Sequence, residues 1–218
     1  MNNILLIIVQ IVLAYLVGSI PSAVWIGKLL YGIDVRQHGS GNAGATNVIR
    51  VLGYKAGIPV LIIDVLKGWV AVQLAYLFPH AAFSADTLTY IRIGLAIAAV
   101  LGHIFPVYAG FKGGKGVGTL AGAGIALFPL ALLIVFGVFV LTLALTRYVS
   151  LSSILGAITF PFIVWFITGE HHPGLVILSI LVALFIPVTH RKNISRLLKG
   201  TENKFDFRRR KDKNEPST

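Results

Sequence analysis

The sequence has no cysteine and few charged residues. Of its 218 residues, 12% are Asp, Glu, Lys or Arg and 56% are apolar, whereas a soluble domain carries about 25% charged residues. The lack of cysteine excludes disulfides, thiolate nucleophiles and cysteine-ligated metals. The low charge and the long apolar runs predict an all-α integral membrane protein that crosses the bilayer several times.

The N-terminus lacks the positively charged segment that begins a secretory signal peptide. The chain starts Met-Asn-Asn, and the apolar run that follows extends over 4–26. A bilayer span needs about 20 residues, so we expect this run to remain in the protein as its first transmembrane helix.

The apolar runs predict about seven transmembrane helices. The run 117–146 is long for one untilted span and short for two, and Pro129 divides it. We therefore predict two short helices there, a pair that enters the membrane and returns. The other expected spans are 4–28 with a kink at Pro21, 56–78, 87–104, 151–168 and 175–188, with a short turn at 79–85. We expect one transmembrane domain over 1–198 and a disordered basic tail over 199–218.

Lysine and arginine gather on one side of this predicted topology. Under the seven-span arrangement they fall in four segments of one side, at 31–55, 109–116, 147–150 and 189–218. The segments of the other side contain Asp86, Glu170 and histidines but no Lys or Arg. Because Lys and Arg concentrate in cytoplasmic loops, we expect the N-terminus outside and the C-terminus in the cytoplasm.

A glycine-rich polar segment between the first two spans is typical of an anion site. It contains Gly39, Ser40, Gly41, Asn42, Gly44, Thr46, Asn47 and Arg50. Small residues let the backbone approach a ligand, and successive N–H groups can surround an anion. Thr46 is suited to cap a helix beginning at Asn47, and a helix N-terminus also attracts anions. An ordinary connecting loop is the competing interpretation.

Charged residues inside and beside the spans allow two interpretations each. Asp64 and Lys67 lie three residues apart within a span, so they are expected to pair, either to fix helix packing or to place Lys67 at the floor of an anion pocket. Lys112 and Lys115 lie in a glycine-rich segment that departs from the Walker A pattern, which argues against nucleotide hydrolysis. These two lysines either contact phosphate or anchor span ends at the membrane interface.

Two histidines at span ends are candidate proton acceptors. His103 is either a general base or phosphate ligand, or an ordinary interfacial residue. His190 and Asn193 are expected on one helix face at the end of the last span. Beyond them, we expect Arg196 and Lys199 to lie on an anionic membrane surface. No metal or cofactor and no nucleic-acid partner is expected.

These patches together resemble the bacterial acyl-phosphate:glycerol-3-phosphate acyltransferase family over nearly the whole chain. The matching stretches are GSGNAGATNVIRVLG (39–53), DVLKG (64–68), GHIFPVYAGFKGGKGV (102–117), RYVSLSS (147–153) and HRKNISRLLKGTE (190–202). The resemblance implies a multi-pass enzyme of the bacterial inner membrane that makes 1-acyl-glycerol-3-phosphate for phospholipid synthesis from acyl phosphate and glycerol-3-phosphate. It also implies a substrate site at Ser40, Arg50, Lys115, Ser150, His190 and Asn193, surrounded by Asn42, Thr46, Asn47, Lys67, His103 and Lys112.

Several features remain open or favour a second class. The sequence does not distinguish Ser150 from Ser152 and Ser153 as the substrate contact. The small residues of 117–124 are expected to leave a lipid-accessible groove for the acyl chain. A transporter of small anions is the alternative, since glycine and proline interrupt the helices and an ion pair lies within a span. The absence of an internal repeat and the position of the polar patches at one face argue against it.

Overall fold

The computed structural model describes residues 3–77 and 83–207, and all regular secondary structure in these ranges is helical. The helices are α1 (Asn3–Gly18), α2 (Ser22–Tyr31), α3 (Ala45–Leu52), α4 (Tyr54–Gln73), α5 (Ala85–Ile104), α6 (Val117–Leu127), α7 (Pro129–Thr146), α8 (Val149–Phe162), α9 (Pro173–Thr189) and α10 (Arg191–Leu198). Short 3₁₀ turns occur at Val35–Gln37, Leu74–Tyr76 and Val107–Ala109, and a π-helical turn at Ile163–Ile167 continues α8. The predicted all-α class is confirmed.

Most of these helices are built to lie in a bilayer. Four helical segments are long and apolar enough to cross one, namely Tyr54–Tyr76, Ala85–Ala109, Pro129–Thr146 and Val149–Ile167. Two bent pairs, α1 with α2 and α9 with α10, can each serve as a further span. Only 11% of α7 is buried, and an outward face this apolar needs lipid around it. The expected number of about seven is reached only by adding α6, a shorter apolar helix of 11 residues.

Two prolines divide the apolar runs where the sequence indicated. The expected kink at Pro21 is a break between α1 and α2 with a bend of 40°, as expected for a residue without a backbone N–H. Pro129 begins α7, so the run 117–146 is indeed divided. The expectation of two short helices is correct for α6 and wrong for α7, which has 18 residues because α6 occupies only the first 11 positions of the run.

α6 ends inside the bundle, and Arg92 makes this possible. The last carbonyl groups of a helix have no partner within it, and in lipid they need a protein donor. Nη2 of Arg92 on α5 donates to the carbonyl oxygen of Ala126 in the last turn of α6, at 2.5 Å. Its guanidinium also lies over the ring of Tyr76, 5.6 Å from the centroid. The guanidinium of Arg92, a charge within a span, thus has both a hydrogen-bond partner and an aromatic partner in the protein.

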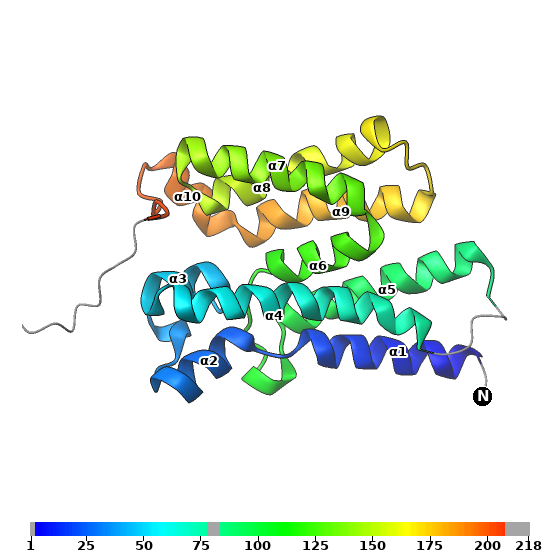
Figure 1. The fold of residues 1–218 in the computed structure, drawn as a ribbon, viewed down its shortest axis with the longest axis horizontal. Helices are drawn as coiled ribbons and strands as arrows, with labels where there is room; N and C mark the ends of the chain where they lie inside the picture. Colours follow the sequence, from blue (N-terminus) through cyan, green and yellow to red (C-terminus); the bar gives the residue numbers. More distant parts are fainter. Residues whose placement is uncertain (1–2, 78–82, 208–218) are drawn as a thin grey trace, which may run out of the picture.

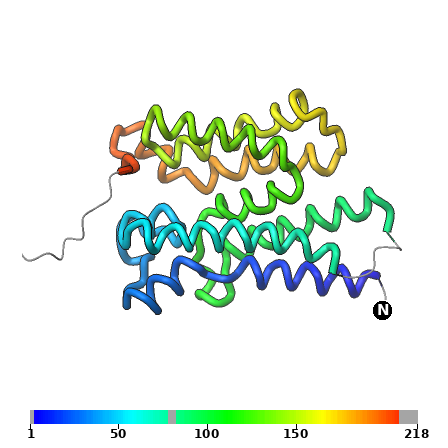
Figure 2. Tube along the Cα trace, viewed as in Figure 1, coloured from blue at the N-terminus to red at the C-terminus, as the bar shows by residue number. Residues whose placement is uncertain are grey.

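The helices form two groups with α6 between them (Figure 1). In the first group, α1 packs on α5 and α4 packs on α6; in the second, α8 packs on α7 and α9. One end of the molecule holds α2, α3 and α10, and Figure 2 shows the segment 199–207 in red beside α10 at that end. Residues 79–82 of the expected turn at 79–85 are outside the described ranges.

Arg147 and the start of the tail lie at the same end. The Phe205 N–H donates to the carbonyl oxygen of Arg147 at 2.6 Å. α8 and α9 lie between these two residues, and together they bring the chain back to the end at which Arg147 lies. Residues 199–207, which the sequence placed in a disordered tail, are packed against the helical domain; residues 208–218 lie outside the described ranges.

Candidate active site

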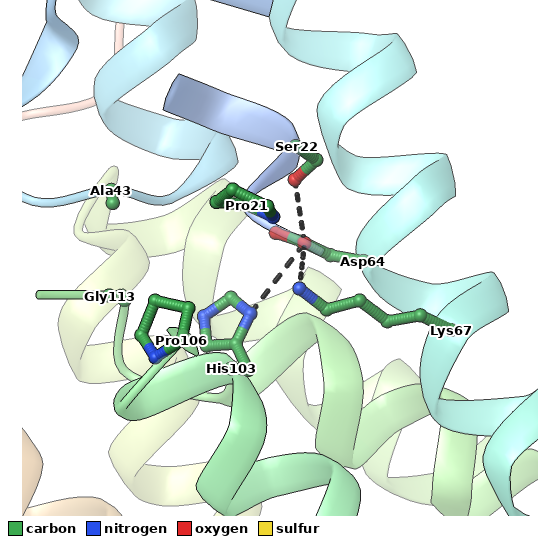
Figure 3. Close-up of a pocket in the computed structure, with 9 residues that line it drawn as sticks. Pro21, Ser22, Ala43, Asp64, Lys67, His103, Pro106 and Gly113 are labelled. Carbon is green, nitrogen blue, oxygen red and sulfur yellow. Dashed lines mark hydrogen bonds and ion pairs between the residues drawn. The ribbon is translucent and has the colours of Figure 1, made fainter. Parts of the chain in front are cut away.

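Four polar side chains meet in a buried cluster between α2, α4 and α5, made of Ser22, Asp64, Lys67 and His103 (Figure 3). Asp64 Oδ1 accepts a hydrogen bond from Ser22 Oγ at 2.8 Å and pairs with Lys67 Nζ at 2.9 Å. Lys67 Nζ also donates to the carbonyl oxygen of Ile20, which the break before Pro21 leaves without a helical partner, at 2.9 Å. The predicted Asp64–Lys67 pair is therefore confirmed, and both of its interpretations remain compatible with this geometry.

His103 belongs to the same cluster and is not an interfacial residue. Its side chain is 5% exposed, and its Nδ1 lies 3.6 Å from Asp64 Oδ1. That separation is beyond a hydrogen bond, and Nδ1 has no hydrogen-bond partner among the described residues. A cavity about the size of one water molecule adjoins the cluster and is lined by Pro21, Ala43, Pro106, Gly113 and Gly114 as well.

The glycine-rich segment 110–116 folds back onto the end of α5. The N–H groups of Gly113 and Gly114 donate to the carbonyl oxygens of Ile104 and His103, at 3.0 and 3.2 Å. A Cβ at Gly114 would lie 2.3 Å from His103 Nε2 and 3.0 Å from the carbonyl oxygen of Ala43. Only glycine fits there, so this segment lies directly between the buried cluster and the loop before α3.

Arg36 joins the same glycine-rich segment to the loop after α2. Its Nη1 donates to the carbonyl oxygens of Ala109 and Lys112 at 2.9 and 3.2 Å, and its Nε and Nη2 bind the Asp34 carboxylate. Hydrogen bonds from Arg36 hold the pKa of Asp34 well below its usual range. The sequence carried no signal of this role for Arg36. Lys112 is exposed and lines an open polar cleft beside Arg36.

The loop before α3 is shaped by Asn47. Its Oδ1 accepts from the Ser40 N–H and hydroxyl at 2.8 and 3.1 Å, and its Nδ2 donates to the carbonyl oxygens of Val35 and His38. The side-chain amide expected at the substrate is thus engaged within the loop. Asn42 differs, because its buried Oδ1 has no hydrogen-bond partner among the described residues.

The expected cap at Thr46 is wrong. α3 begins at Ala45 with Gly44 as its N-cap residue, and no side chain caps it. The Asn47 and Val48 N–H groups donate to the Gly44 carbonyl oxygen, so Thr46 already lies in the first turn. Arg50, one turn after Asn47 in α3, faces a different set of partners.

A second group of side chains, the cationic cluster, gathers around the carboxylate of Glu202. Oε1 accepts from Ser150 Oγ at 2.8 Å and Asn193 Nδ2 at 2.6 Å, and Oε2 pairs with Arg196 Nε at 2.6 Å. Asn193 Oδ1 in turn accepts a short hydrogen bond from Lys115 Nζ. Arg50 lies close enough for Glu202 and Arg196 to act on its charge. We define the cationic cluster as Arg50, Lys115, Ser150, His190, Asn193 and Arg196.

Burial and crowding of like charges mark this cluster as an anion site. Burial lowers the pKa of Lys115 to about 8, opposed by Glu202 and reinforced by Arg196 and Arg50. Burial likewise lowers the pKa of Arg50. Burial raises the pKa of Glu202, but hydrogen bonds from Arg196, Asn193 and Ser150 outweigh it and leave the pKa below its usual value. Buried cations of this kind are stable only with an anion among them.

The structure distinguishes Ser150 from Ser152 and Ser153, which the sequence could not. Ser152 and Ser153 donate back to the carbonyl oxygens of Tyr148 and Val149 in the same turn, whereas Ser150 alone points at Glu202. The expectation that Arg196 lies on the membrane surface is wrong, because it pairs with Glu202. Glu202 itself was missed, although it is the one carboxylate in the matching stretch 190–202.

His190 and Asn193 do not share a face of one helix as expected. His190 lies at the bend of 62° between α9 and α10. Both side chains are nevertheless buried, because the bend turns α10 back over the end of α8. His190 Nδ1 lies 2.9 Å from the carbonyl oxygen of Ile186; a carbonyl only accepts, so Nδ1 carries the proton and Nε2 is left as the acceptor.

The small residues of 117–124 do not leave the expected groove for the acyl chain, because they pack against α4. Gly118 contacts Asp64, and Gly122 packs against the backbone of Val65 and Trp69 in α4. These glycines bring α6 close to α4 and leave no space between the two helices. Among the described residues, no three His, Asp or Glu side chains come together as a metal site would require.

The fold and these two clusters define an integral membrane protein that gathers cationic and amide donors around one carboxylate at one end. A family model described as glycerol-3-phosphate acyltransferase matches residues 8–200. Glycerol-3-phosphate acyltransferases of Chlorobium phaeobacteroides and Fusobacterium nucleatum are each 46% identical to this chain, covering 94% and 90% of it and 99% and 97% of their own lengths.

Two crystal structures of PlsY (YgiH), described as an integral membrane glycerol 3-phosphate acyltransferase, resemble this fold. Both are 38% identical to this chain and cover 92% of it. The glycerol 3-phosphate form has a TM-score of 0.82 and is covered over 96% of its length, and the lysophosphatidic acid form has a TM-score of 0.79 and is covered over 95%. The chain belongs to the glycerol-3-phosphate acyltransferase family.

Proposed function

We propose that this protein transfers a fatty acyl group from acyl phosphate to glycerol-3-phosphate, releasing 1-acyl-glycerol-3-phosphate and inorganic phosphate. The observation that carries the proposal is the convergence of Ser150, Asn193 and Arg196 on the Glu202 carboxylate, with Lys115 bound to Asn193 and Arg50 close by. Such donors suit the phosphate of glycerol-3-phosphate, since hydrogen bonds between charged groups are about twice as strong as neutral ones. The glycerol 3-phosphate form and the lysophosphatidic acid form of PlsY agree with this substrate and product.

The two clusters would serve different parts of the reaction. The cationic cluster would bind substrate phosphate, with Lys112 and the loop residues Ser40, Asn42, Thr46 and Asn47 around it. The buried cluster would hold Lys67 and His103 in place beside the glycine-rich segment, whose neighbouring residues Gly114 and Lys115 connect the two. His103 or His190 would accept the hydroxyl proton, or a substrate phosphate oxygen would.

Acyl transfer would be direct. The glycerol-3-phosphate hydroxyl oxygen attacks the acyl carbonyl carbon, the bond from that carbon to the phosphate oxygen breaks, and phosphate leaves. Acyl phosphate is an activated mixed anhydride, so its phosphate is a good leaving group. Holding the two substrates in the correct geometry can lower the barrier by about 7–11 kcal/mol. A covalent route needs a nucleophile beside an available base. Ser40 donates to the Asn47 amide and Ser150 to a carboxylate already paired with Arg196, so neither has one.

The setting would be the bacterial inner membrane, with both clusters facing the cytoplasm, where glycerol-3-phosphate is available. The product would leave sideways into the bilayer for phospholipid synthesis. A membrane orientation of this kind follows from the concentration of Lys and Arg at the end of the molecule that holds α3 and α10.

A donor comparison tests this function. Purified protein in detergent is given glycerol-3-phosphate with acyl phosphate, acyl-CoA or acyl carrier protein, and 1-acyl-glycerol-3-phosphate is measured. We expect product from acyl phosphate alone, without sealed vesicles. Protein treated with acyl phosphate only and then analysed by intact mass should carry no acyl group. Product from a thioester donor would overturn the donor assignment, and a stoichiometric serine adduct would overturn direct transfer.

A further inference from the structure

The carboxylate of Glu202 occupies the position that the proposed function gives to an anionic substrate. Its side chain is 6% exposed, and both of its oxygens are used, Oε1 by Ser150 and Asn193 and Oε2 by Arg196. These are donors that a bound phosphate would need. Two anions cannot share them, because the repulsion of like charges is strong where water is excluded.

Glu202 lies on a strap, residues 199–207, that has neither helix nor strand. Before Glu202 the Thr201 N–H donates to the Arg196 carbonyl oxygen at 2.8 Å. Beyond Glu202 the Phe205 N–H donates to the Arg147 carbonyl oxygen, and the Tyr54 hydroxyl donates to the Asp206 carbonyl oxygen at 2.7 Å. Two ring contacts add to these bonds, Phe205 edge-on against Tyr54 and Lys204 Nζ over the ring of Tyr148. A segment held in this way, with no helix or strand of its own, opens at lower free energy than the helical core.

A glycine marks the point where the strap could turn. α10 ends at Leu198, and Gly200 follows with a φ of 68°, in the left-handed region where glycine is unstrained. A Cβ at Gly200 would meet nothing within 4 Å. Rotation about Gly200 would break the Thr201 N–H bond to the Arg196 carbonyl and carry Glu202 away, while Asn193 and Arg196 stay in place on α10.

We infer that Glu202 is the resident anion of the cationic cluster and that the phosphate of the substrate displaces it. The inference rests on the proposed function, since it assigns the substrate's phosphate to this cluster. Without substrate, Glu202 offsets the charges of Arg50, Lys115 and Arg196 and keeps their side chains converged. A phosphate dianion brings more charge and more acceptor oxygens than a carboxylate, so it takes over the same donors.

Displacement makes Glu202 a residue that sets substrate affinity. When only a fraction of the protein has the cluster open, the apparent Kd is the intrinsic Kd divided by that fraction. Glu202 thus weakens binding of the substrate phosphate and, by returning, favours release of an anionic product. A purely structural Glu202 would have the opposite effect, because its loss would scatter the donors and weaken binding.

The test compares Glu202→Gln with the unchanged protein. Glutamine keeps the shape and one acceptor oxygen but removes the charge that competes with phosphate. We expect the KM for glycerol-3-phosphate and the Kd for inorganic phosphate to fall about five- to tenfold. Glu170→Gln, at the opposite end of the molecule, should change neither. A raised or unchanged KM in Glu202→Gln would overturn the inference.

A second measurement uses a chain with its natural Glu202, so it holds even if the Gln variant does not fold. Because the sequence has no cysteine, a nitroxide on Asn203→Cys reports the strap alone. Inorganic phosphate should increase the mobility of the label, and sodium chloride at equal ionic strength should not. A label that stays immobile at saturating phosphate would overturn displacement.

Arg50→Ala distinguishes a failure of the displacement from a failure of the proposed phosphate site. If it raises the KM for glycerol-3-phosphate while Glu202→Gln does not lower it, the cluster binds phosphate and only the displacement is wrong. If Arg50→Ala leaves the KM unchanged, the assignment of substrate phosphate to this cluster fails, and the displacement fails with it.

Discussion

Gly122→Ala should damage the site from a distance, because α6 approaches α4 too closely for any side chain at that position. A Cβ at Gly122 would lie 1.8 Å from the carbonyl oxygen of Val65 and 2.9 Å from the backbone nitrogen of Trp69. Neither atom can rotate away. The two helices would have to separate by roughly 1.5 Å to restore an ordinary van der Waals contact.

Moving the two helices apart should lower both the stability and the activity of the protein. Overpacking of this kind costs about 1–3 kcal/mol of stability. α4 carries Asp64 and Lys67 on the turn that faces Gly118 and the start of α6, so the buried cluster and the glycine-rich segment would move relative to each other. A misplacement of about 1 Å can reduce catalysis by about 100-fold, and we expect a loss of kcat/KM on that order together with a lower Tm in detergent.

Gly94→Ala is the matched control. Gly94 also lies within a helix, and a Cβ there would meet nothing within 4 Å. Alanine is better than glycine in a helix by about 1 kcal/mol, so this variant should be as stable as the unchanged protein or more so, with full activity. Equal Tm and equal kcat/KM for the two variants would refute the argument that the close contact of α6 with α4 positions the site.

Three further predictions concern the loops and the cationic cluster. Burial lowers the pKa of Lys115 to about 8, so its charge is present below that pH and lost above it, while the substrate phosphate stays dianionic above about pH 6. The KM for glycerol-3-phosphate should therefore rise from pH 7 to 9. Lys115→Arg keeps its charge over this range and should flatten the rise. Arg36→Ala should lower kcat/KM about tenfold by releasing two hydrogen bonds to the glycine-rich segment, and wild-type kinetics would show that this segment needs no clamp. In intact cells an impermeant thiol reagent should label Glu170→Cys and not Arg147→Cys; the reverse result would invert the proposed orientation.

The sequence by itself determined the membrane class, the break at Pro21, the division at Pro129 and the polar patches at one end. These are local properties. The length of an apolar run fixes whether it can cross the bilayer. Proline has no backbone N–H to donate and its ring clashes with the preceding turn, so it favours a break in a helix. The pairing of Asp64 with Lys67 followed from the same logic, because two opposite charges one turn apart in a span need each other.

The tertiary structure decided which side chains meet. Ser22 reaches Asp64 across 42 positions and Ser150 reaches Glu202 across 52, and such pairs depend on how helices cross, which no local pattern contains. Residue type also left each amide open to several partners. Asn47 is engaged within its own loop, whereas Asn193 joins Lys115 to Glu202. The role of Glu202 depends on the turn at Gly200, which brings the chain back over α8 and places the carboxylate among the cations. Cations buried together require a negative charge near them, and only the fold decides which residue supplies it.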